Sequence, residues 1–504
     1  MDLVPLLDLR GQRVLIFIVA YNAATTIERV LARIPASLHQ AGVEVLVIDD
    51  SSQDETFRRG LSYQQSHAAL KMTVLRTVEN QGYGGNQKLG YCYAIDEGFD
   101  IVALVHGDGQ YAPEELPTLL DPLLRGEADA VFGSRMIDKR AARAGDMPLY
   151  KWLGNQVLTT FQNKVLNTRL SEFHSGYRLY ATRALAQVPF SKNTHDFHFD
   201  TEIIIQFVLK GLRIVELPIP TFYGDEICHV NGLRYALDVF RATIKARLCR
   251  VHLFYDRKFD VDPAATTHSD KLGFASSQTF AVEAGMAGKE VLQLGLGHGE
   301  VAEALRQRGC QVTAVDFAAS EFAPTGLPVA VPAPQIPEDI SAYDQVLLMD
   351  LIEHLHDPES FVDQLRQRTV GKRPEVIITA ANVAFFIPRI MLALGQFNYS
   401  RKGILGLGHR RLFTFRSLRA LLEEAGYEIL EARGVPAPFP LALGRNRWSR
   451  ALLQINQLLL RISKSLFSYQ LCFRARALPI ASHLLRETIE SSTALRAEAL
   501  RQSA

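Results

Sequence analysis

The sequence contains no apolar stretch that reads as an uninterrupted membrane span. The nearest candidate, "VIITAANVAFFIPRIMLALG" at residues 376–395, is interrupted by Asn382, Pro388 and Arg389. A spanning helix needs about 20 consecutive, mostly apolar residues, so a buried strand followed by a helix explains this stretch better. We therefore expect a cytoplasmic protein, or at most one held peripherally at the inner face of the membrane.

Cysteine pairs, net charge and a secretion signal are also missing. The five cysteines are scattered, with no CxxC pair and no metal-ligand spacing, which favours a reduced, cytoplasmic setting. The first residues, "MDLVPLLDLRGQR", carry acids and lack the pattern of a signal peptide. The net charge of +1 gives no support for a nucleic-acid partner.

The length of 504 residues is too great for one ordinary hydrophobic core and predicts two domains of about 200–250 residues. The composition, 47% hydrophobic and 22% charged, is typical of globular proteins. A polar stretch without periodicity, "DRKFDVDPAATTHSDKLG", predicts a linker between the halves. We expect a first domain at residues 1–255, the linker at 256–273, a second domain at 274–435 and a helical C-terminal extension at 436–504.

Short apolar runs alternate with helical patterns along both halves, which predicts two α/β domains with parallel sheets covered by helices. The strand candidates are residues 13–20, 43–50, 71–77, 100–107 and 128–134 in the first half, and 289–295, 310–316, 343–350 and 374–380 in the second.

Polar residues follow two of these strands directly. "VLIFIVAYNAATTI" is a buried strand that runs into a polar turn at Tyr21 and Asn22, and "VLVIDDSSQDET" is a strand that ends in Asp49 and Asp50. Ligands of open α/β sheets collect at the carboxyl ends of strands, where a carboxylate can accept hydrogen bonds from a nucleobase edge or a ribose. Ser52 and Glu55 have capping-box spacing and could simply start a helix.

The stretch "VALVHGDGQYAPEE" places a lone acid between two glycines after a buried strand. His106, Asp108 and Gln110 alternate, so on extended backbone their side chains share one face. Carboxylate and amide oxygens suit Mg²⁺ and Mn²⁺, and such a metal would neutralise charge on a departing nucleotide diphosphate. The alternative is a glycine turn with a solvated Asp108.

The motifs "AYN", "IDDSSQDET", "ENQGYGGNQKLGYCYA", "HGDGQYAPEEL", "GSR", "SGYRLY" and "HDFHFDTEIIIQ" follow one another over about residues 13–250. Together they resemble glycosyltransferase family 2 of the GT-A fold, and most of all its polyprenyl-phosphate sugar transferases. The resemblance implies an inverting, metal-dependent transfer of a sugar from a nucleotide-sugar donor to a lipid-phosphate or glycan acceptor.

The resemblance also assigns residues. It implies that Ala20, Tyr21, Asp49 and Asp50 lie at the nucleoside of the donor, and that Asp108 and Gln110, with His106, hold Mn²⁺ or Mg²⁺. The family often has Asp in place of His106, so we expect a preference for Mn²⁺. Arg135 and Arg178 lie in motifs that face phosphates, although either could form a salt bridge instead.

Asp200 and Glu202 are the candidates for the acceptor side. A sugar hydroxyl acceptor benefits from a general base, whereas a phosphate is already anionic near neutral pH and needs none. Either carboxylate could instead be structural. The basic, amphipathic segment at residues 231–255 could touch anionic lipid or pack on the domain.

In the second half, "KEVLQLGLGHGEVAEALRQRGCQVTAVDF" combines a GxGxG loop at Gly295, Gly297 and Gly299 with Asp316 at the end of the next strand. With "EHLHDP" and "GHRRLFTFRSLRALLEEAGYEI", residues 271–427 resemble class I S-adenosylmethionine-dependent methyltransferases. The resemblance implies S-adenosyl-L-methionine as the cofactor. The spacing and "EHLHDP" argue against a nicotinamide oxidoreductase.

Two departures from the methyltransferase pattern leave an alternative open. Gln293 stands where the family usually has an acid, and no acid matches the usual one near the adenine. His354 could act as a base for a hydroxyl acceptor or could orient its loop, and His409 with Arg410 and Arg411 could contact an anionic substrate. We therefore expect a bifunctional enzyme of cell-envelope glycan biosynthesis whose second domain methylates the glycan product. The alternative is a glycosyltransferase whose second domain is a non-catalytic binding module.

Overall fold

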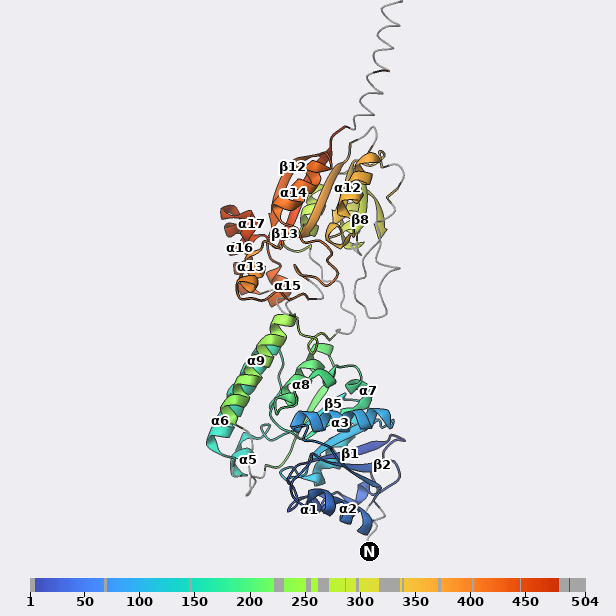
Figure 1. The fold of residues 1–504 in the computed structure, drawn as a ribbon, viewed down its shortest axis with the longest axis vertical. Coiled ribbons are helices and arrows are strands. Elements are labelled where there is room, and N and C mark those ends of the chain that lie inside the picture. Colours follow the sequence, from blue (N-terminus) through green and yellow to red (C-terminus); the bar gives the residue numbers. More distant parts are fainter. Residues whose placement is uncertain are drawn as a thin grey trace, which may run out of the picture. The chain divides into compact units, whose positions relative to one another are not determined.

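The computed structural model describes residues 5–67, 70–145, 147–221, 231–250, 255–261, 272–285, 287–295, 299–316, 336–337, 340–369, 373–400, 403–444, 446–479 and 489. The chain divides into two compact units, one of Met1–Cys249 and Asp256–Thr266, the other of Arg250–Tyr255 and Thr267–Ala504 (Figure 1). Residues 256–261, expected at the start of the linker, thus group with the first unit. Residues 262–271 of the expected linker lie outside the described residues.

The first unit is built on a sheet with the strand order β3-β2-β1-β4-β6-β5-β7 among its described residues. Its strands are β1 (Val14–Ala20), β2 (Val43–Asp49), β3 (Met72–Arg76), β4 (Ile101–His106), β5 (Ala130–Ser134), β6 (Arg178–Ala181) and β7 (Ile214–Pro218). Only β6 runs antiparallel to its described neighbours, β4 and β5.

Helices of the first unit connect and cover these strands. The α-helices are α1 (Ile27–Ala32), α2 (Thr56–Ser66), α3 (Tyr83–Asp96), α4 (Leu116–Leu124), α5 (Lys139–Ala144), α6 (Leu149–Leu166), α7 (Thr182–Leu185), α8 (Phe199–Lys210) and α9 (Gly232–Arg250). Short 3₁₀ turns are η1 (Ala36–Leu38), η2 (Pro113–Glu115) and η3 (Phe190–Lys192).

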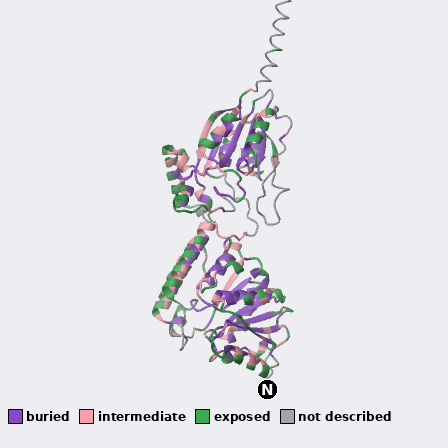
Figure 2. Ribbon diagram, viewed as in Figure 1, coloured by how far each residue is buried: buried purple, intermediate pink, exposed green. Residues whose placement is uncertain are grey.

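Burial explains why the central strands read as continuous apolar runs. Every residue of β1 is buried, because helices cover both faces of the sheet (Figure 2). Helix α3 approaches β1 so closely that a Cβ at Gly90 would come 2.1 Å from the Phe17 ring. Glycine at this position therefore allows α3 to pack closely on the sheet, and this packing positions the first turn of the helix.

The second unit contains a sheet with the order β12-β13-β11-β10-β8-β9. Its strands are β8 (Glu290–Gly295), β9 (Gln311–Asp316), β10 (Gln345–Met349), β11 (Glu375–Ala381), β12 (Tyr427–Val435) and β13 (Gln470–Ala477). Its helices are α10 (Ser277–Ala284), α11 (Gly299–Gln307), η4 (Ile352–His354), α12 (Pro358–Gln367), α13 (Phe386–Ala393), α14 (Phe415–Glu424), α15 (Phe439–Leu443), α16 (Arg447–Ile462) and α17 (Lys464–Phe467).

Alternate residues of β10 belong to separate apolar clusters. Val346 and Leu348 lie in one cluster, and Leu347 and Met349 in another. Successive side chains of a strand point to opposite faces, so this sheet too is covered on both sides. The two-domain α/β architecture predicted from the sequence is confirmed.

Each of the nine predicted strands is present, but the sheets are mixed rather than parallel. Of the described strands, β6, β7, β12 and β13 were not predicted, and β6 and β13 run antiparallel to both of their neighbours. Residues 470–477, expected to be helical, form β13, which lies between β11 and β12. In this segment Arg474 and Arg476 alternate with buried residues and pair with Glu375 on β11 (3.0 Å each), which is the two-residue period of a strand.

The stretch at residues 376–395 forms β11 and then α13, as predicted. Among the helices of the described residues, none combines the length and apolar character needed to cross a bilayer.

Candidate functional site

The predicted residues at the ends of β1 and β2 lie together. Ala20 and Asp49 are register partners, and the Asp50 amide donates to the Ala20 carbonyl (2.9 Å). Both carboxylates are almost fully buried, whereas the neighbouring Tyr21 side chain is exposed. The ends of the two strands thus carry an exposed tyrosine ring and a buried pair of acids. The two acids are neighbours simply because they are consecutive in the sequence.

Asp50 is held in one orientation. Its Oδ1 accepts hydrogen bonds from the Gln81 amide (2.8 Å) and the Thr77 hydroxyl (3.1 Å). No described residue donates a hydrogen bond to its Oδ2. Asp50 therefore has one oxygen engaged by the protein and the other available to a hydrogen-bond donor of a ligand.

Asp49 holds the loop that follows β2. It accepts from the Ser52 amide (3.3 Å) and the Ser52 hydroxyl, and its Oδ2 lies 3.5 Å from Arg76 Nε. Burial raises the pKa of Asp49, and the bonds from Ser52 oppose this rise. Ser52 also accepts from the Asn22 amide (2.8 Å), so it joins the loops after β1 and β2.

The capping-box interpretation of Ser52 is wrong. Helix α2 begins at Thr56, and the residue before it makes no side-chain cap. The backbone after each strand is left-handed instead, with φ of +50° at Asn22 and +59° at Ser51. These turns were not predicted from the sequence. They follow the carboxyl ends of β1 and β2, which lie at the same edge of the sheet because the two strands are parallel.

The end of β4 differs from the prediction. β4 ends at His106, and Gly109 has φ of +77°, so the backbone turns where an extended course was expected. Asp108 is exposed and accepts from the Gln110 amide (2.9 Å). His106, Asp108 and Gln110 therefore do not alternate along one extended strand, and their side chains are not brought to one face by that geometry.

The imidazole of His106 packs toward the interior. Its Nε2 lies 3.3 Å from the Tyr83 hydroxyl, and its ring centroid lies 5.0 Å from that of Tyr111. A Cβ at Gly176 would come 2.5 Å from this ring. Burial lowers the pKa of His106, with Asp108 and Asp200 opposing the shift.

Asp200, in the first turn of α8, is engaged through both oxygens. Oδ2 accepts from the Tyr83 hydroxyl (2.9 Å), and Oδ1 accepts from Gln87 Nε2 (3.1 Å). Arg178 Nη1 lies 3.4 Å from Oδ1. Tyr83 and Gln87 were missed by the sequence analysis, although both lie in the quoted motif "ENQGYGGNQKLGYCYA" and recur at the four-residue spacing of one helix face.

Glu202 has different partners from Asp200. It accepts from the Thr194 amide (2.7 Å) and from Lys258 Nζ (2.6 Å), and it is almost fully buried. Lys258 belongs to the segment just before the undescribed linker residues. Glu202 therefore holds surrounding chain segments together, while Asp200 connects to the end of β4.

The two candidate phosphate-binding arginines are buried and engaged. Arg178 is only 1% exposed and donates to the carbonyls of Ser175 (2.8 Å), Asp200 (2.9 Å) and Phe173 (2.9 Å). Arg135 pairs with Glu172 (2.5 Å). Burial would raise the pKa of Glu172, but the charge of Arg135 and hydrogen bonds outweigh it and lower this pKa.

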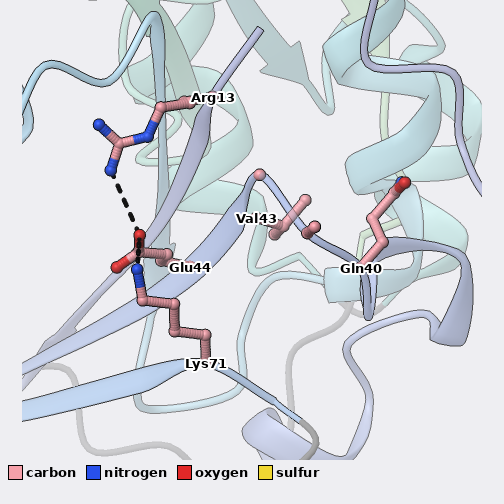
Figure 3. Close-up of a pocket in the computed structure, with 7 residues that line it drawn as sticks. Arg13, Gln40, Val43, Glu44 and Lys71 are labelled. Atoms are coloured by element: carbon pink, nitrogen blue, oxygen red, sulfur yellow. Dashed lines mark hydrogen bonds and ion pairs between the residues drawn. The ribbon is translucent and has the colours of Figure 1, made fainter. Parts of the chain in front are cut away.

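A hollow of about 460 Å³ lies away from these residues. It is lined by Arg13, Gln40, Val43, Glu44 and Lys71 among others (Figure 3). Its residues precede or begin β1, β2 and β3, so it lies at the amino ends of the strands. Glu44 pairs there with Arg13 (3.3 Å) and with Lys71. The hollow is therefore remote from the candidate site, which is at the carboxyl ends.

In the second unit, Gly295 ends β8 and pairs in register with Asp316 at the end of β9. Gly299 begins α11, whereas Gly297 lies outside the described residues. The strand ends and the following helix thus have the order that the glycine-loop prediction requires. Gln293 is buried within β8.

Asp350 lies directly after β10 at the same edge of the sheet. Both its oxygens accept from Gln470 Nε2 (2.9 Å each), and Oδ1 also accepts from the Thr379 hydroxyl (2.7 Å). Its backbone is left-handed, with φ of +49°. Asp350 was not among the predicted site residues, although it follows a buried strand just as Asp49 does.

His354 and His409 meet in this unit. Their ring centroids are 4.8 Å apart in an edge-to-face arrangement, and His354 Nδ1 lies 3.0 Å from the Gly408 carbonyl. Burial lowers the pKa of His354 and lowers that of His409 to about 4. A carbonyl can only accept, so Nδ1 of His354 carries the proton and Nε2 is the basic nitrogen.

The structure separates the three residues considered for anion binding. His409 points inward, with Nδ1 3.0 Å from the Ile404 carbonyl. Arg411 makes a surface ion pair with Glu359 (2.9 Å), and the Arg410 amide donates to the Glu353 carbonyl (2.7 Å). The arrangement therefore does not form a joint anion-binding group of His409, Arg410 and Arg411.

The comparisons with known families confirm both resemblances. Residues 15–188 match the family model described as glycosyl transferase family 2. Residues 272–432 match the model described as a methyltransferase domain. The chain therefore combines a glycosyltransferase domain with a methyltransferase-type domain.

Individual relatives match one part of the chain each. Undecaprenyl-phosphate mannosyltransferase of Micrococcus luteus is 28% identical over 220 residues, which cover 43% of this chain and 85% of the relative. Ubiquinone biosynthesis O-methyltransferase of Pseudomonas aeruginosa is 25% identical over 205 residues, covering 36% of this chain and 82% of the relative. A structure of glucosyl-3-phosphoglycerate synthase from Mycobacterium tuberculosis with Mg²⁺ and uridine diphosphate has a TM-score of 0.37 at 19% identity, covering 47% of this chain and 79% of that one.

Proposed function

We propose that the first domain transfers a sugar from a nucleotide diphosphate donor to a phosphate carried by a polyprenyl-type lipid. The observation that carries this proposal is the convergence of Tyr21, Asp50 and Asp108 after β1, β2 and β4, which are neighbours in the sheet. The Micrococcus luteus relative, named for transfer to undecaprenyl phosphate, supports the choice of acceptor.

Asp50 and Tyr21 suit the nucleoside of the donor. The oriented carboxylate of Asp50 can accept from a base edge or a ribose hydroxyl through Oδ2. Tyr21, with 46% of its surface exposed, offers a ring face against which a base can stack. Asp49 keeps the adjoining loop in place through Ser52, which is a positioning role.

A divalent cation, Mn²⁺ or Mg²⁺, would neutralise negative charge on the departing nucleotide. Asp108 fits such an ion because its carboxylate is exposed and flanked by two glycines, which allow a diphosphate to approach. The described residues contain no group of three or more His, Cys, Asp and Glu that could hold a metal. Phosphate oxygens of the donor, with the side-chain carbonyl oxygen of Gln110, would have to complete the coordination of the ion. His106 fits less well because its ring packs against Tyr83 and Gly176.

The contacts of Asp200 favour a phosphate acceptor over a hydroxyl. A general base needs an oxygen directed at the substrate, but both oxygens of Asp200 accept hydrogen bonds from the protein. A phosphate acceptor needs no base. We assign Asp200 to positioning Tyr83 and the end of β4, with Arg178 acting through Asp200 rather than on phosphate.

Exposed apolar side chains on α6 and α9 suit an acceptor with a lipid tail. Leu153 and Val157 of α6 are exposed, as are Leu237 and Phe240 of α9. The two helices touch through Phe161 and Phe240, whose ring centroids are 4.8 Å apart. The opposite side of α9 packs on the domain, as its buried residues indicate. This pairing supports peripheral contact of the domain with a membrane.

For the second domain we infer S-adenosylmethionine-dependent methylation of the glycan product. The pairing of Gly295 with Asp316 supports a cofactor site at the ends of β8 and β9. His354, neutral near pH 7 and with Nε2 basic, can take a proton from a hydroxyl acceptor. Fusion of two enzymes raises the effective concentration of the product at the second site. The competing function is a non-catalytic binding module, which the uncharged Gln293 favours.

The first activity is tested with labelled sugars linked to UDP, GDP, dTDP or CDP. Transfer to undecaprenyl phosphate is measured in detergent with Mn²⁺. Labelled S-adenosylmethionine added afterwards tests the second. We expect one nucleotide to support lipid labelling, and the product then to acquire a methyl group. Transfer to a free glycan but never to lipid phosphate would refute the acceptor. Lipid glycosylation without methylation would leave the binding module.

A further inference from the structure

Helix α16 turns a row of apolar side chains away from the fold. Trp448, Leu452, Ile455, Leu459 and Ile462 recur at alternating spacings of four and three residues, which places them on one helix face. Leu459 is half-buried, and the other four are exposed. Trp448 is 81% exposed and Ile462 is 75% exposed. The described residues of the second unit therefore leave most of this row uncovered.

The face of α16 that packs on the fold is partly polar. Ser449 and Asn456 are buried together with Leu453. Asn456 accepts from the Ala437 amide (2.9 Å) and donates to the Phe467 carbonyl (3.0 Å). A helix that served only to cover the fold would bury its apolar row and expose polar residues. In α16 the exposed row is apolar instead, as it is on surfaces that take a partner.

Helix α13 contributes a second group of exposed apolar residues beside the same helices. α13 contacts α17 through Phe386 and Phe467, whose ring centroids are 6.1 Å apart. Ile390, Leu392 and Leu394, on α13 and just after it, are all more than half exposed. α13, α15, α16 and α17 lie together beside the sheet (Figure 1), and their surfaces are largely exposed (Figure 2).

Charge in these segments has one sign. Residues 432–479 contain eight Arg and Lys and no Asp or Glu, and residues 376–422 contain seven Arg and Lys and no Asp or Glu. Five of these fifteen cations form ion pairs with acids outside the two ranges: Arg411, Arg419, Arg433, Arg474 and Arg476. The basic residues of α16 are Arg447, Arg450 and Arg461. An apolar row whose only charged neighbours on α16 are cations complements an anionic surface that also has an apolar interior.

We propose that this surface, formed by Ile390, Leu392, Leu394, Trp448, Ile455 and Ile462, docks on an anionic lipid bilayer. Helices with basic residues beside an apolar row of Trp and Leu lie in the membrane interface with that row buried. Trp448 would then lie at the level of the headgroups. The inference does not depend on the reaction of either domain, and its segments are separate from α6 and α9.

A second copy of the chain fits this surface less well. Two helices that pair along such a row usually carry opposite charges on its borders. Here Arg447, Arg450 and Arg461 of two copies would face each other without acids between them. Lipid phosphates remove that repulsion, whereas self-association does not.

Trp448 provides a direct measurement, because the chain has only two tryptophans. In the full-length Trp152→Phe protein, the fluorescence reports on Trp448 alone. We expect vesicles of anionic lipid to shift its emission to the blue, and lipids brominated on the acyl chain to quench it, while vesicles of neutral phosphatidylcholine do neither. Binding to anionic vesicles with no shift and no quenching of Trp448 would overturn the proposal.

A pair of variants tests the surface by a second route. Ile455→Gln with Ile462→Gln, in the full chain, should lower the partition coefficient onto anionic vesicles about tenfold or more, since two large apolar side chains are lost from the contact. The matched control is Leu6→Gln with Leu89→Gln, which changes two exposed leucines of the first unit and should alter binding less than about twofold. An equal loss of vesicle binding in the two double variants would show that the α16 surface is not the specific membrane contact. A blue shift that follows protein concentration without lipid would show a second copy as the partner.

Discussion

The hydroxyl of Tyr83 donates a 2.9 Å hydrogen bond to Asp200, across 117 residues of the sequence. The same hydroxyl lies 3.3 Å from His106, the last residue of β4. Tyr83 therefore joins the first turn of α8 to the strand end that precedes Asp108. The Tyr83 hydroxyl thus joins Asp200, on the proposed acceptor side, to the strand end that precedes the proposed metal ligand Asp108.

Replacing Tyr83 by Phe should lower sugar transfer about tenfold and stability by about 1–3 kcal/mol, because a buried carboxylate loses a hydrogen bond. Burial, with the nearby charge of Asp200, raises the pKa of Tyr83 well above its ordinary value, so its hydroxyl carries a proton at any working pH. The effect should therefore be constant between pH 6 and 9. Initial rates with labelled donor and urea unfolding measure the two changes.

The control for this substitution is Tyr91→Phe on the same helix. Tyr91 is also buried and donates to Gln87 (2.8 Å), but it makes no hydrogen bond to Asp200. We expect a similar loss of stability with less effect on the rate. If both variants lose activity in proportion to their stability, Tyr83 has no positioning role at the site.

Asp200→Asn should retain transfer within about tenfold, because a phosphate acceptor needs no general base. Loss of a true base typically costs 10²–10⁴ in rate, so a fall of that size would assign Asp200 to catalysis and favour a hydroxyl acceptor. Glu202→Gln weakens the contact with Lys258 and should cost about 1–3 kcal/mol of stability while the rate per folded molecule stays unchanged. Steady-state rates corrected for the folded fraction separate these outcomes.

The sequence predicted the strand ends of the first domain because each buried apolar run stops at a polar residue. It could not predict the contacts of Asp200, since Tyr83, Gln87 and Arg178 reach it from elements far apart in the chain. The alternation rule failed beyond His106 because β4 ends there and the left-handed Gly109 turns the backbone between Asp108 and Gln110. Antiparallel β13 was missed since the helical pattern of the preceding α16 extended the expectation into a strand with a two-residue period.

Removing divalent metal should abolish transfer, and Asp108→Asn should lower it at least about a hundredfold, since the charge that holds the ion is lost. Because a His stands where the family often has an Asp, we expect Mn²⁺ to restore activity after chelation better than Mg²⁺. Rates in a titration of each ion give the comparison. Equal rates with the two ions would contradict the preference, and full activity in EDTA would contradict a metal at this site.

Stability of the first domain should fall with acid through His174. Burial lowers the pKa of this histidine from 6.5 to about 4. Between those values the unfolded chain binds the proton and the folded one does not, so the stabilisation is full above pH 6.5 and is lost as the pH falls toward 4. The slope from one such group is at most about 1.4 kcal/mol per pH unit.

The measurement is urea unfolding at several pH values, followed by Trp152 in a Trp448→Phe background. His174→Gln should flatten the dependence between pH 6.5 and 4 relative to the parent. His39, an exposed histidine of the same unit, gives the matched control, and His39→Gln should leave the slope unchanged. An identical slope in all three proteins would mean that His174 is not buried in its neutral form.

Gln293→Asp should strengthen binding of S-adenosylmethionine. Gln293 lies in β8, two residues before Gly295, where related methyltransferases usually carry an acid that can hold the cofactor electrostatically. A charged hydrogen-bond partner adds about 1–3 kcal/mol, which corresponds to about 5- to 150-fold in affinity. Calorimetric titration of both proteins measures this gain. The opposite result, weaker or equal binding with loss of stability, would mean that the buried strand tolerates only an uncharged residue. The domain would then have departed from cofactor binding at that position, and the binding-module function would follow.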